Sequence, residues 1–254
     1  MAEVLGSRNR LSISGWYSGP LKSRLATTRF SRSFGEIDQS LFEGSLNPIY
    51  LEPGRIATLR DIFATESSVS LPDFLAEAVF DEWRQQLYEL AVMAPVVRPA
   101  TVRRFHSVGN ECLALCLLRS SAFARFISRI TGVELSAHAV QGRLFTAGHY
   151  TMLHDQAMPP PGLDVCLTMG GGLTEGSGGT LHYILRADAV DPDEDDALLA
   201  LAADANTLHI VLRDGDTMRY VKRISAAKAG DAYRLDVDAI YRLAEDERET
   251  PVNG

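Results

Sequence analysis

The chain has 254 residues, of which 46% are hydrophobic and 23% charged, with a net charge of −8 at pH 7. These values exclude a wholly disordered chain, and the acidic balance argues against a general nucleic-acid-binding surface. No run of 18 apolar residues occurs, and the N-terminus lacks a charged segment followed by an apolar one. We therefore expect neither a transmembrane helix nor a secretory signal. Three cysteines are too few for a disulfide framework, which favours the cytoplasm or nucleus.

The charge is uneven along the chain. Residues 1–34 contain six Lys or Arg and one Glu, a local charge of +5, so the other 220 residues carry −13. This basic arm is also rich in Ser and Gly. We expect a poorly ordered arm over 1–34, either a solvated terminus or a docking or targeting segment, followed by one domain over 35–254.

Helical patterns gather in the first half of the chain. Ser70 is placed to cap a helix that Pro95 ends, with an apolar stripe near period 3.6. That stripe comprises Leu71, Phe74, Leu75, Val79, Trp83, Leu87 and Leu90. Shorter amphipathic helices are predicted over 56–63, 111–118 and 121–130. Gly132 follows the last of them, where a left-handed residue is wanted.

After Gly132 the hydrophobic period becomes two. Short segments rich in β-forming residues are separated by Gly, Pro and Asp. They are 140–145, 150–153, 163–169, 180–185, 207–212, 218–224 and 233–237. Seven closely spaced strands predict a barrel or sandwich, with the earlier helices covering one face. An acidic insert over 191–196 is expected to be a surface loop leading into a short Ala/Leu helix.

One segment has the residue types of a facial-triad iron site. It is GHYTMLHDQ (148–156), and it places His154, Asp155 and Gln156 at a strand end. Two imidazoles and one carboxylate on one face of a metal form the Fe(II) site of many oxygenases. The required spacing is His-x-Asp, because residues i and i+2 of a strand point to the same side. Here i+2 is the neutral Gln156, so a strand-end histidine beside an exposed Asp155 is the alternative.

The sequence also leaves two interpretations for the second imidazole of such a site. His209 alternates with Leu208 and Ile210, so it faces either a cavity or a cross-strand polar neighbour. His182 has the same two interpretations. The glycine-rich segment 170–179 precedes a strand rather than a helix, so it lacks the helix N-terminus that a phosphate site requires.

Together these segments resemble one family. GHYTMLHD, LDVCLTM, GGTLHYI, NTLHIVLRD and MRYVKRIS follow SLPDFL and SSAFARFISRITG in that order. The series is similar to the C-terminal half of two-domain prolyl hydroxylases that act on a ribosomal protein, and it covers residues 10–243. The family includes the yeast translation-termination and polyadenylation hydroxylase and a fission-yeast oxygen-sensing protein that promotes degradation of a sterol regulator.

The resemblance implies a fold and a division of labour. Family members carry two double-stranded β-helix domains, of which the first binds Fe(II) and 2-oxoglutarate, with ascorbate as a co-reductant, and hydroxylates. The second is a degradation domain that keeps the fold without the metal site. The fold expected here is therefore α+β, a jelly-roll or cupin-like double-stranded β-helix with helices packed on one face.

The arm carries part of this resemblance. RLSISGWYSGP (10–20) is similar to the last strand of the family's catalytic domain, and Arg10 matches the arginine that holds the 5-carboxylate of 2-oxoglutarate. A bidentate guanidinium–carboxylate contact is the physical reason for arginine there. The usual histidine is replaced by Ser18. The metal ligands that should precede this strand are missing, so the chain resembles the second half of a longer protein.

The second domain echoes the first. Lys222 lies twelve residues before Arg234, as the distal metal histidine precedes its arginine in the catalytic domain. The resemblance therefore implies a vestigial pocket of His154, Gln156 and Lys222, with Arg10 and Arg234 at former 2-oxoglutarate positions. An ammonium group repels a divalent cation, so no metal, cofactor or catalytic residue is predicted. A salt bridge to a neighbouring aspartate is the expected use of Arg234.

Three functions are weighed. The favoured one is a non-catalytic oxygenase-fold domain that acts by protein contact, supports the catalytic domain and meets regulatory or ribosomal proteins, without membrane or direct nucleic-acid contact. An active prolyl hydroxylase would use His154, Asp155 and His209 as ligands, with Arg219 or Arg234 for 2-oxoglutarate. A small-acid-binding barrel is the third.

Overall fold

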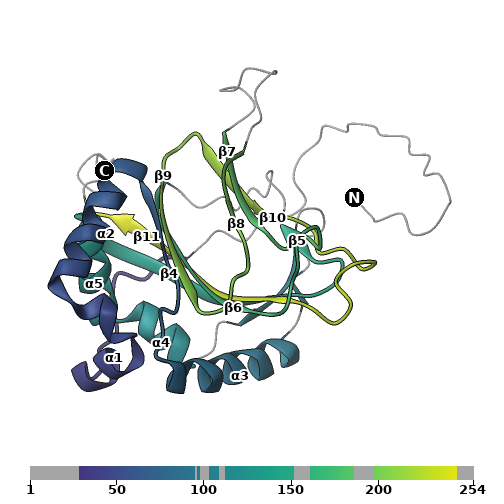
Figure 1. Cartoon of the computed structure of the whole chain (residues 1–254), viewed down its shortest axis with the longest axis horizontal. Coiled ribbons are helices and arrows are strands. Elements are labelled where there is room, and N and C mark those ends of the chain that lie inside the picture. The colour runs from purple at the N-terminus through teal and green to yellow at the C-terminus, as the bar shows by residue number, and fades with distance from the viewer. Residues whose placement is uncertain are drawn as a thin grey trace, which may run out of the picture.

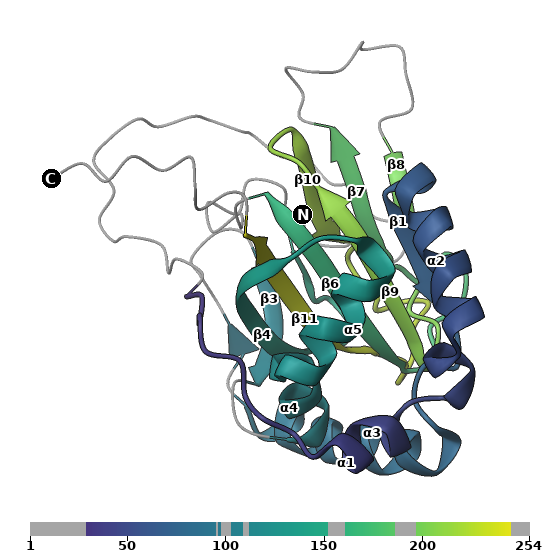
Figure 2. The same cartoon turned by 90° about the vertical axis from the view of Figure 1, so that its left-hand side faces the viewer.

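A computed structural model describes residues 29–94, 96–97, 103–108, 112–151, 161–185 and 197–244 of the chain. Two antiparallel sheets face each other, and helices cover the outer face of the larger sheet (Figures 1 and 2). The helices are α1 (Gln39–Ser45), the 3₁₀ helix η1 (Pro48–Leu51), α2 (Pro53–Glu66), α3 (Glu77–Met93), α4 (Leu113–Arg119) and α5 (Ser121–Thr131).

The strands form two sheets that together make a jelly roll. They are β1 (Ser68–Leu71), β2 (Val96–Val97), β3 (Arg103–Val108), β4 (Leu135–Phe145), β5 (Tyr150–Thr151), β6 (Gly162–Gly170), β7 (Leu181–Leu185), β8 (Ala197–Leu201), β9 (Thr207–Arg213), β10 (Thr217–Val221) and β11 (Arg234–Leu243). The larger sheet has the order β1-β9-β6-β11-β4-β3-β2, and the smaller one β10-β7-β8. β5 pairs with β3 and lies beside β10. Because the chain alternates between the sheets, the fold is the predicted α+β double-stranded β-helix.

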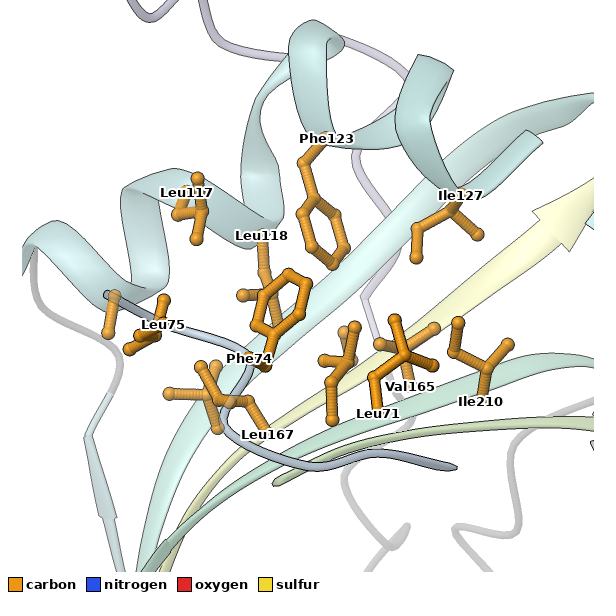
Figure 3. Close-up of a cluster of buried hydrophobic side chains, with 14 of the residues drawn as sticks. Leu71, Phe74, Leu75, Leu117, Leu118, Phe123, Ile127, Val165, Leu167 and Ile210 are labelled. Carbon is orange, nitrogen blue, oxygen red and sulfur yellow. The ribbon is translucent and has the colours of Figure 1, made fainter. Parts of the chain in front are cut away.

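The main core lies between the larger sheet and the helices. Alternate residues of β1, β6 and β9 point to this side, where side chains from α4, α5 and the turn after β1 meet them (Figure 3). The labelled members are Leu71, Phe74, Leu75, Leu117, Leu118, Phe123, Ile127, Val165, Leu167 and Ile210. All are at most 1% exposed. Each fully buried Leu, Ile, Val or Phe stabilises the fold by about 1.5–3 kcal/mol.

Helix α5 forms where its sequence predicts. The Ser120 hydroxyl accepts a hydrogen bond from the backbone of Phe123 at 3.1 Å, which caps the first turn. Gly132 ends the helix with φ of 77°, the left-handed conformation expected at that position. The apolar residues of α5 consequently face the sheet.

The predicted start of α3 is wrong. Ser70 and Leu71 belong to β1, where Ser70 pairs with His209 of β9, and the helix begins only at Glu77. A proline at position 72 and a left-handed Asp73 (φ 49°) form a turn between strand and helix. The apolar spacing was misleading because Leu71 and Phe74 reach the same core from a strand and a turn.

The predicted strands are confirmed, with two kinds of error. All seven occur, at β4, β5, β6, β7, β9, β10 and β11. The expected Ala/Leu helix after the acidic insert is instead strand β8, which pairs with β7. Three strands in the first half, β1 to β3, were missed. In each case cross-strand pairing within the folded sheet outweighs the local preference.

The described part of the basic arm contacts the domain. Ser31 exchanges two backbone hydrogen bonds of 2.8 Å with His138 of β4. Residues 1–28, which include Arg10, lie outside the described part of the chain. Within the described residues, no helix has both the length and the apolar character needed to span a bilayer.

Candidate functional site in the barrel interior

The inner face of the larger sheet carries many charged side chains beside a smaller apolar cluster that includes Phe145 and Val211. On β4, β6, β9 and β11 the residues that alternate with the apolar core point toward the smaller sheet. They include Arg143, Asp164, Cys166, His209, Arg213, Arg234, Asp236 and Asp238, none more than 5% exposed. Arg219 reaches the same space from β10 of the smaller sheet. We call the four arginines and three aspartates the interior ion cluster.

Arg234 lies at the centre of this cluster and is fully buried. Its Nε donates to the Asp236 carboxylate at 2.6 Å, and its Nη1 donates to the carbonyl oxygen of Gly179 at 2.9 Å. Its Nη2 lies 3.4 Å from the Cys166 sulfur. All three guanidinium nitrogens of Arg234 therefore have a partner within the protein.

Asp236 binds two arginines at once. Arg143 donates to both of its oxygens, from Nε at 2.7 Å and from Nη2 at 3.0 Å, and Arg234 is the second partner. Burial works to raise the pKa of Asp236, but the two guanidinium groups outweigh it and leave the pKa below its ordinary value. Asp236 is therefore a stable carboxylate in the barrel interior.

Arg219 joins the two sheets. It donates to both oxygens of Asp238 on β11, at 2.9 and 3.0 Å, and lies 3.4 Å from Asp164 on β6. Arg213 of β9 contacts the same Asp164 oxygen at 3.0 Å. Burial opposes the charge on Arg219, yet Asp164 and Asp238 raise its pKa well above the ordinary value. Bidentate pairs of this kind fix both distance and orientation.

Cys166 and His209 are two uncharged residues beside the interior ion cluster. Burial, with Asp236 next in effect, raises the pKa of the Cys166 thiol to about 12, so it is not a nucleophile. Burial also lowers the pKa of His209 to about 4, with Arg234 adding to the effect. The Nδ1 of His209 lies 2.8 Å from the Ser70 hydroxyl. His209 is therefore a neutral imidazole at physiological pH.

The comparisons with known proteins agree with this architecture. The family described as "Oxoglutarate and iron-dependent oxygenase degradation C-term" matches residues 38–249. The chain belongs to this family. The match runs over almost the whole described domain, from just before α1 to just beyond β11.

Curated relatives of this degradation-domain family member are longer proteins. The chain is 28% identical to prolyl 3-hydroxylase OGFOD1 of Xenopus laevis, over 89% of this chain and 52% of the relative. It is 24% identical to prolyl 3-hydroxylase OGFOD1 of Mus musculus, over 89% of this chain and 55% of the relative. The chain thus spans about half the length of the curated relatives it matches.

Solved structures share the fold. A Pseudomonas putida prolyl-4-hydroxylase matches with a TM-score of 0.54 and 16% identity, over 74% of this chain and 98% of that one. A prolyl hydroxylase from Trichoplax adhaerens, in complex with a hypoxia inducible factor peptide fragment, has a TM-score of 0.54 and 15% identity. It covers 79% of this chain and 97% of that one. These values establish the double-stranded β-helix of the degradation domain.

The structure brings only some of the expected site residues together. Arg234 and Arg219 both lie in the interior ion cluster, and Arg234 makes the expected salt bridge to a neighbouring aspartate. Lys222 does not join them: its side chain is exposed, because it follows the end of β10, although its backbone pairs with Thr180 and Gly179. His154, Asp155 and Gln156 lie outside the described residues.

The donor set around Arg234 does not fit 2-oxoglutarate. Each guanidinium nitrogen of Arg234 already contacts Asp236, Gly179 or Cys166, so a second carboxylate would have to compete with Asp236 inside a fully buried space. For a metal ion, no group of three His, Cys, Asp or Glu side chains converges within the part of the chain that the structure describes. His209, proposed as an alternative ligand, is on β9 with Nδ1 bound to Ser70.

Sequence reasoning missed most of the cluster. Four of its members were not singled out from the sequence, because none of them lies in a recognisable motif. They are Arg143, Asp164, Asp236 and Asp238. The available signal was charge at alternate positions of otherwise apolar strands, as in Arg234–Asp236–Asp238 with period two. Charged residues on the buried face of a strand require partners, so such a pattern predicts an internal ion network.

Proposed function

We propose that this chain is a non-catalytic member of the prolyl hydroxylase family's oxygenase fold and acts as a scaffold through protein contact. The observation that carries the proposal is that every guanidinium nitrogen of Arg234 already has a partner within the protein. At the position where the resemblance places a cosubstrate arginine, the guanidinium is bound to Asp236, to the Gly179 carbonyl and to Cys166. An arginine held in this way closes the barrel instead of binding a ligand.

The rest of the interior ion cluster supports the same conclusion. Asp236 and Asp238 lie between arginines from β4, β10 and β11. Removing one partner of a buried pair costs about 3–5 kcal/mol, so exchanging these contacts for a diffusible carboxylate is strongly unfavourable. Lys222 adds a positive charge near the surface and offers no ligand to a divalent cation.

Iron and 2-oxoglutarate binding test the proposal directly. The purified chain is loaded with Fe(II) under argon, its iron is counted by mass spectrometry, and 2-oxoglutarate binding is measured by calorimetry in the presence of Mn(II). We expect iron well below one per chain and no binding heat for 2-oxoglutarate. The Pseudomonas putida enzyme, treated in parallel, shows that the assays detect a working site.

An active oxygenase would give different results. Iron near one per chain, with succinate formed in proportion to added Fe(II), would overturn the proposal. That activity would disappear in a His154→Ala variant and persist in a His182→Ala variant, since His182 lies on the outer face of the smaller sheet. Binding of 2-oxoglutarate without iron would instead indicate a small-acid-binding barrel.

The length of the relatives supports a proposal for the class of partner. The chain matches about half of two prolyl 3-hydroxylases, so we propose that it supports a catalytic half and contacts regulatory or ribosomal proteins in the cytoplasm or nucleus. The test combines the purified chain with the isolated N-terminal half of the Xenopus laevis relative. We expect a stable complex by gel filtration and a higher melting temperature for that half, whereas two independent elution peaks would count against this role.

A further inference from the structure

Residues 29–36 run across the domain in an extended conformation before α1 begins. Figure 2 shows this purple segment passing beside β4 and α4 on its way to α1. The segment lies N-terminal to the matched family region, which starts at residue 38. We call residues 29–36 the strap.

The strap is bound through its backbone at two places. Ser31 donates to the carbonyl of His138 and accepts from its amide, both at 2.8 Å. Four residues later, Gly35 donates to the carbonyl of Arg119 at 2.9 Å and accepts from the amide of Ser121 at 2.8 Å. These contacts hold the strap on β4 and on the junction between α4 and α5.

Two aromatic side chains of the strap, Phe30 and Phe34, add contacts to these backbone bonds. Phe34 packs against the main core, with its ring 4.9 Å from the His138 ring and stacked 6.5 Å from Tyr241. The Arg242 guanidinium lies over the Phe30 ring at 4.3 Å, a cation–π contact. The two rings therefore engage the ends of β4 and β11 that are furthest from β3.

The pairing of the larger sheet explains why the strap lies beside the first half of β4. Among the described residues, β3 pairs with β4 from Gly142 to Leu144, whereas β11 pairs with β4 along its whole length. An unpaired strand edge at His138 would present open backbone groups, which are a site for unwanted strand pairing. Ser31 covers this edge at His138.

We propose that the surface formed by His138, Tyr241, Arg242 and Ser121 is a docking site for the chain's own strap, so that residues 29–36 belong to the folded unit although they precede the matched family region. A flexible connector carries few contacts to the domain it joins. The strap has four backbone hydrogen bonds and two aromatic anchors instead.

Amide hydrogen exchange on the full chain tests the docking. We expect the Ser31 and Gly35 amides to be protected in the wild type and to exchange about 10-fold faster or more in a Phe34→Ala variant. Ser33→Ala is the matched control within the strap, because the structure assigns contacts to the backbone of Ser33 and none to its hydroxyl. Amides of β6 report whether the domain itself remains folded.

A second variant guards against a trivial loss of folding. Ser31→Pro removes the N–H that bonds to His138 while leaving Phe34 in place, and it should also accelerate exchange at Gly35. Wild-type exchange of Ser31 and Gly35 at the rate of an unstructured peptide would overturn the docking site. Unchanged exchange in both variants, with β6 still protected, would do the same.

A peptide in trans separates this proposal from the proposed function. The peptide of residues 28–37 is titrated into the Phe34→Ala chain, where it should bind and restore a protected environment around His138. The same peptide carrying Phe34→Ala should not bind. Absence of binding by the native peptide contradicts the docking site but leaves the scaffold role intact. Iron or succinate findings, in turn, bear only on catalysis.

Discussion

Arg234 donates from Nε to the carboxylate of Asp236, two residues further along β11, at 2.6 Å, and both side chains are fully buried. Neighbours at i and i+2 on a strand share a face, so the pair is formed within one element and is then enclosed by the smaller sheet. Arg143 from β4 completes the arrangement on the other side of Asp236. Buried ion pairs thus connect the strands that surround the barrel interior.

Removing the Asp236 charge should destabilise the fold severely. Asp236→Asn leaves Arg143 and Arg234 buried without their shared carboxylate, and we expect a loss of about 3–5 kcal/mol in the free energy of unfolding. Urea unfolding followed by the fluorescence of the buried Trp83 measures it. The exposed Asp231 provides the control, and Asp231→Asn should change stability by less than about 0.5 kcal/mol. Equal stabilities of the two variants would show that the cluster contributes nothing net.

The contact between the sheets should appear as a coupling energy. Arg219 and Asp238 form a bidentate pair across the barrel, yet Asp238 also contacts Arg143 at 3.2 Å and is not left isolated when Arg219 is replaced. Arg219→Met and Asp238→Asn, singly and together, form a double-mutant cycle. We expect a coupling of about 0.5–3 kcal/mol. Strict additivity of the two substitutions would mean that the Arg219–Asp238 pair contributes no net energy to the contact between the sheets.

His209 should make the fold sensitive to mild acid. Burial lowers its pKa in the folded state to about 4, below the ordinary 6.5 of the unfolded chain. The unfolded state therefore binds the proton first, and the stability that is present above pH 6.5 is lost as the pH falls toward 4. The loss attributable to this group at pH 4 is about 3 kcal/mol.

A His209→Gln variant isolates that contribution. Glutamine keeps a polar group near Ser70 but does not titrate. The stability of the variant should therefore fall less steeply than that of the wild type between pH 6.5 and 4. Thermal unfolding at closely spaced pH values gives the stability of each protein as a function of pH. Subtracting one curve from the other removes the contribution of the carboxylates that both proteins share. Parallel curves would show that His209 is not protonated on unfolding in this range.

Two glycines before β7 should respond very differently to the same substitution. Gly176 and Gly178 both have positive φ, 77° and 84°. A Cβ at Gly178 would lie 2.0 Å from the carbonyl oxygen of Arg223, whereas at Gly176 the nearest atom is Nζ of Lys228 at 3.4 Å. Gly176→Ala should cost about 1–2 kcal/mol from the backbone conformation alone.

Gly178→Ala should cost clearly more than Gly176→Ala, because a carbonyl of the backbone has to move as well. Melting temperatures of both variants under identical conditions provide the comparison. If the two values fall by the same amount, the loop adapts freely and the close approach to Arg223 is not a constraint on the fold.

Local sequence patterns determined much of the architecture. Period-two hydrophobicity after Gly132 identified all seven predicted strands, because one face of the larger sheet is continuously apolar. The apolar spacing over 121–130 and the glycine at position 132 placed α5 within a residue at each end. Where the pattern was ambiguous, as at Leu71 and at 197–201, pairing with β9 and β7 decided for strand.

The interior ion cluster was harder to predict from the sequence than the fold. The neighbour relation of Arg234 to Asp236 is local, so a salt bridge there could be expected from the chain alone. The contributions of Arg143, Asp164 and Arg219 depend on strands that are distant in sequence and are brought together by the sheet order. The position of Lys222 outside the cluster also required the folded chain, because a residue just after a strand end is free to turn toward solvent.

The amino-acid sequence by itself determined the fold family, since that depends on residue types at fixed spacings. Tertiary structure alone decided how the charged strand faces are neutralised and where the strap is bound. Those outcomes depend on distances of a few ångströms between remote segments, and in a buried environment such distances determine whether a charge is stabilised or excluded.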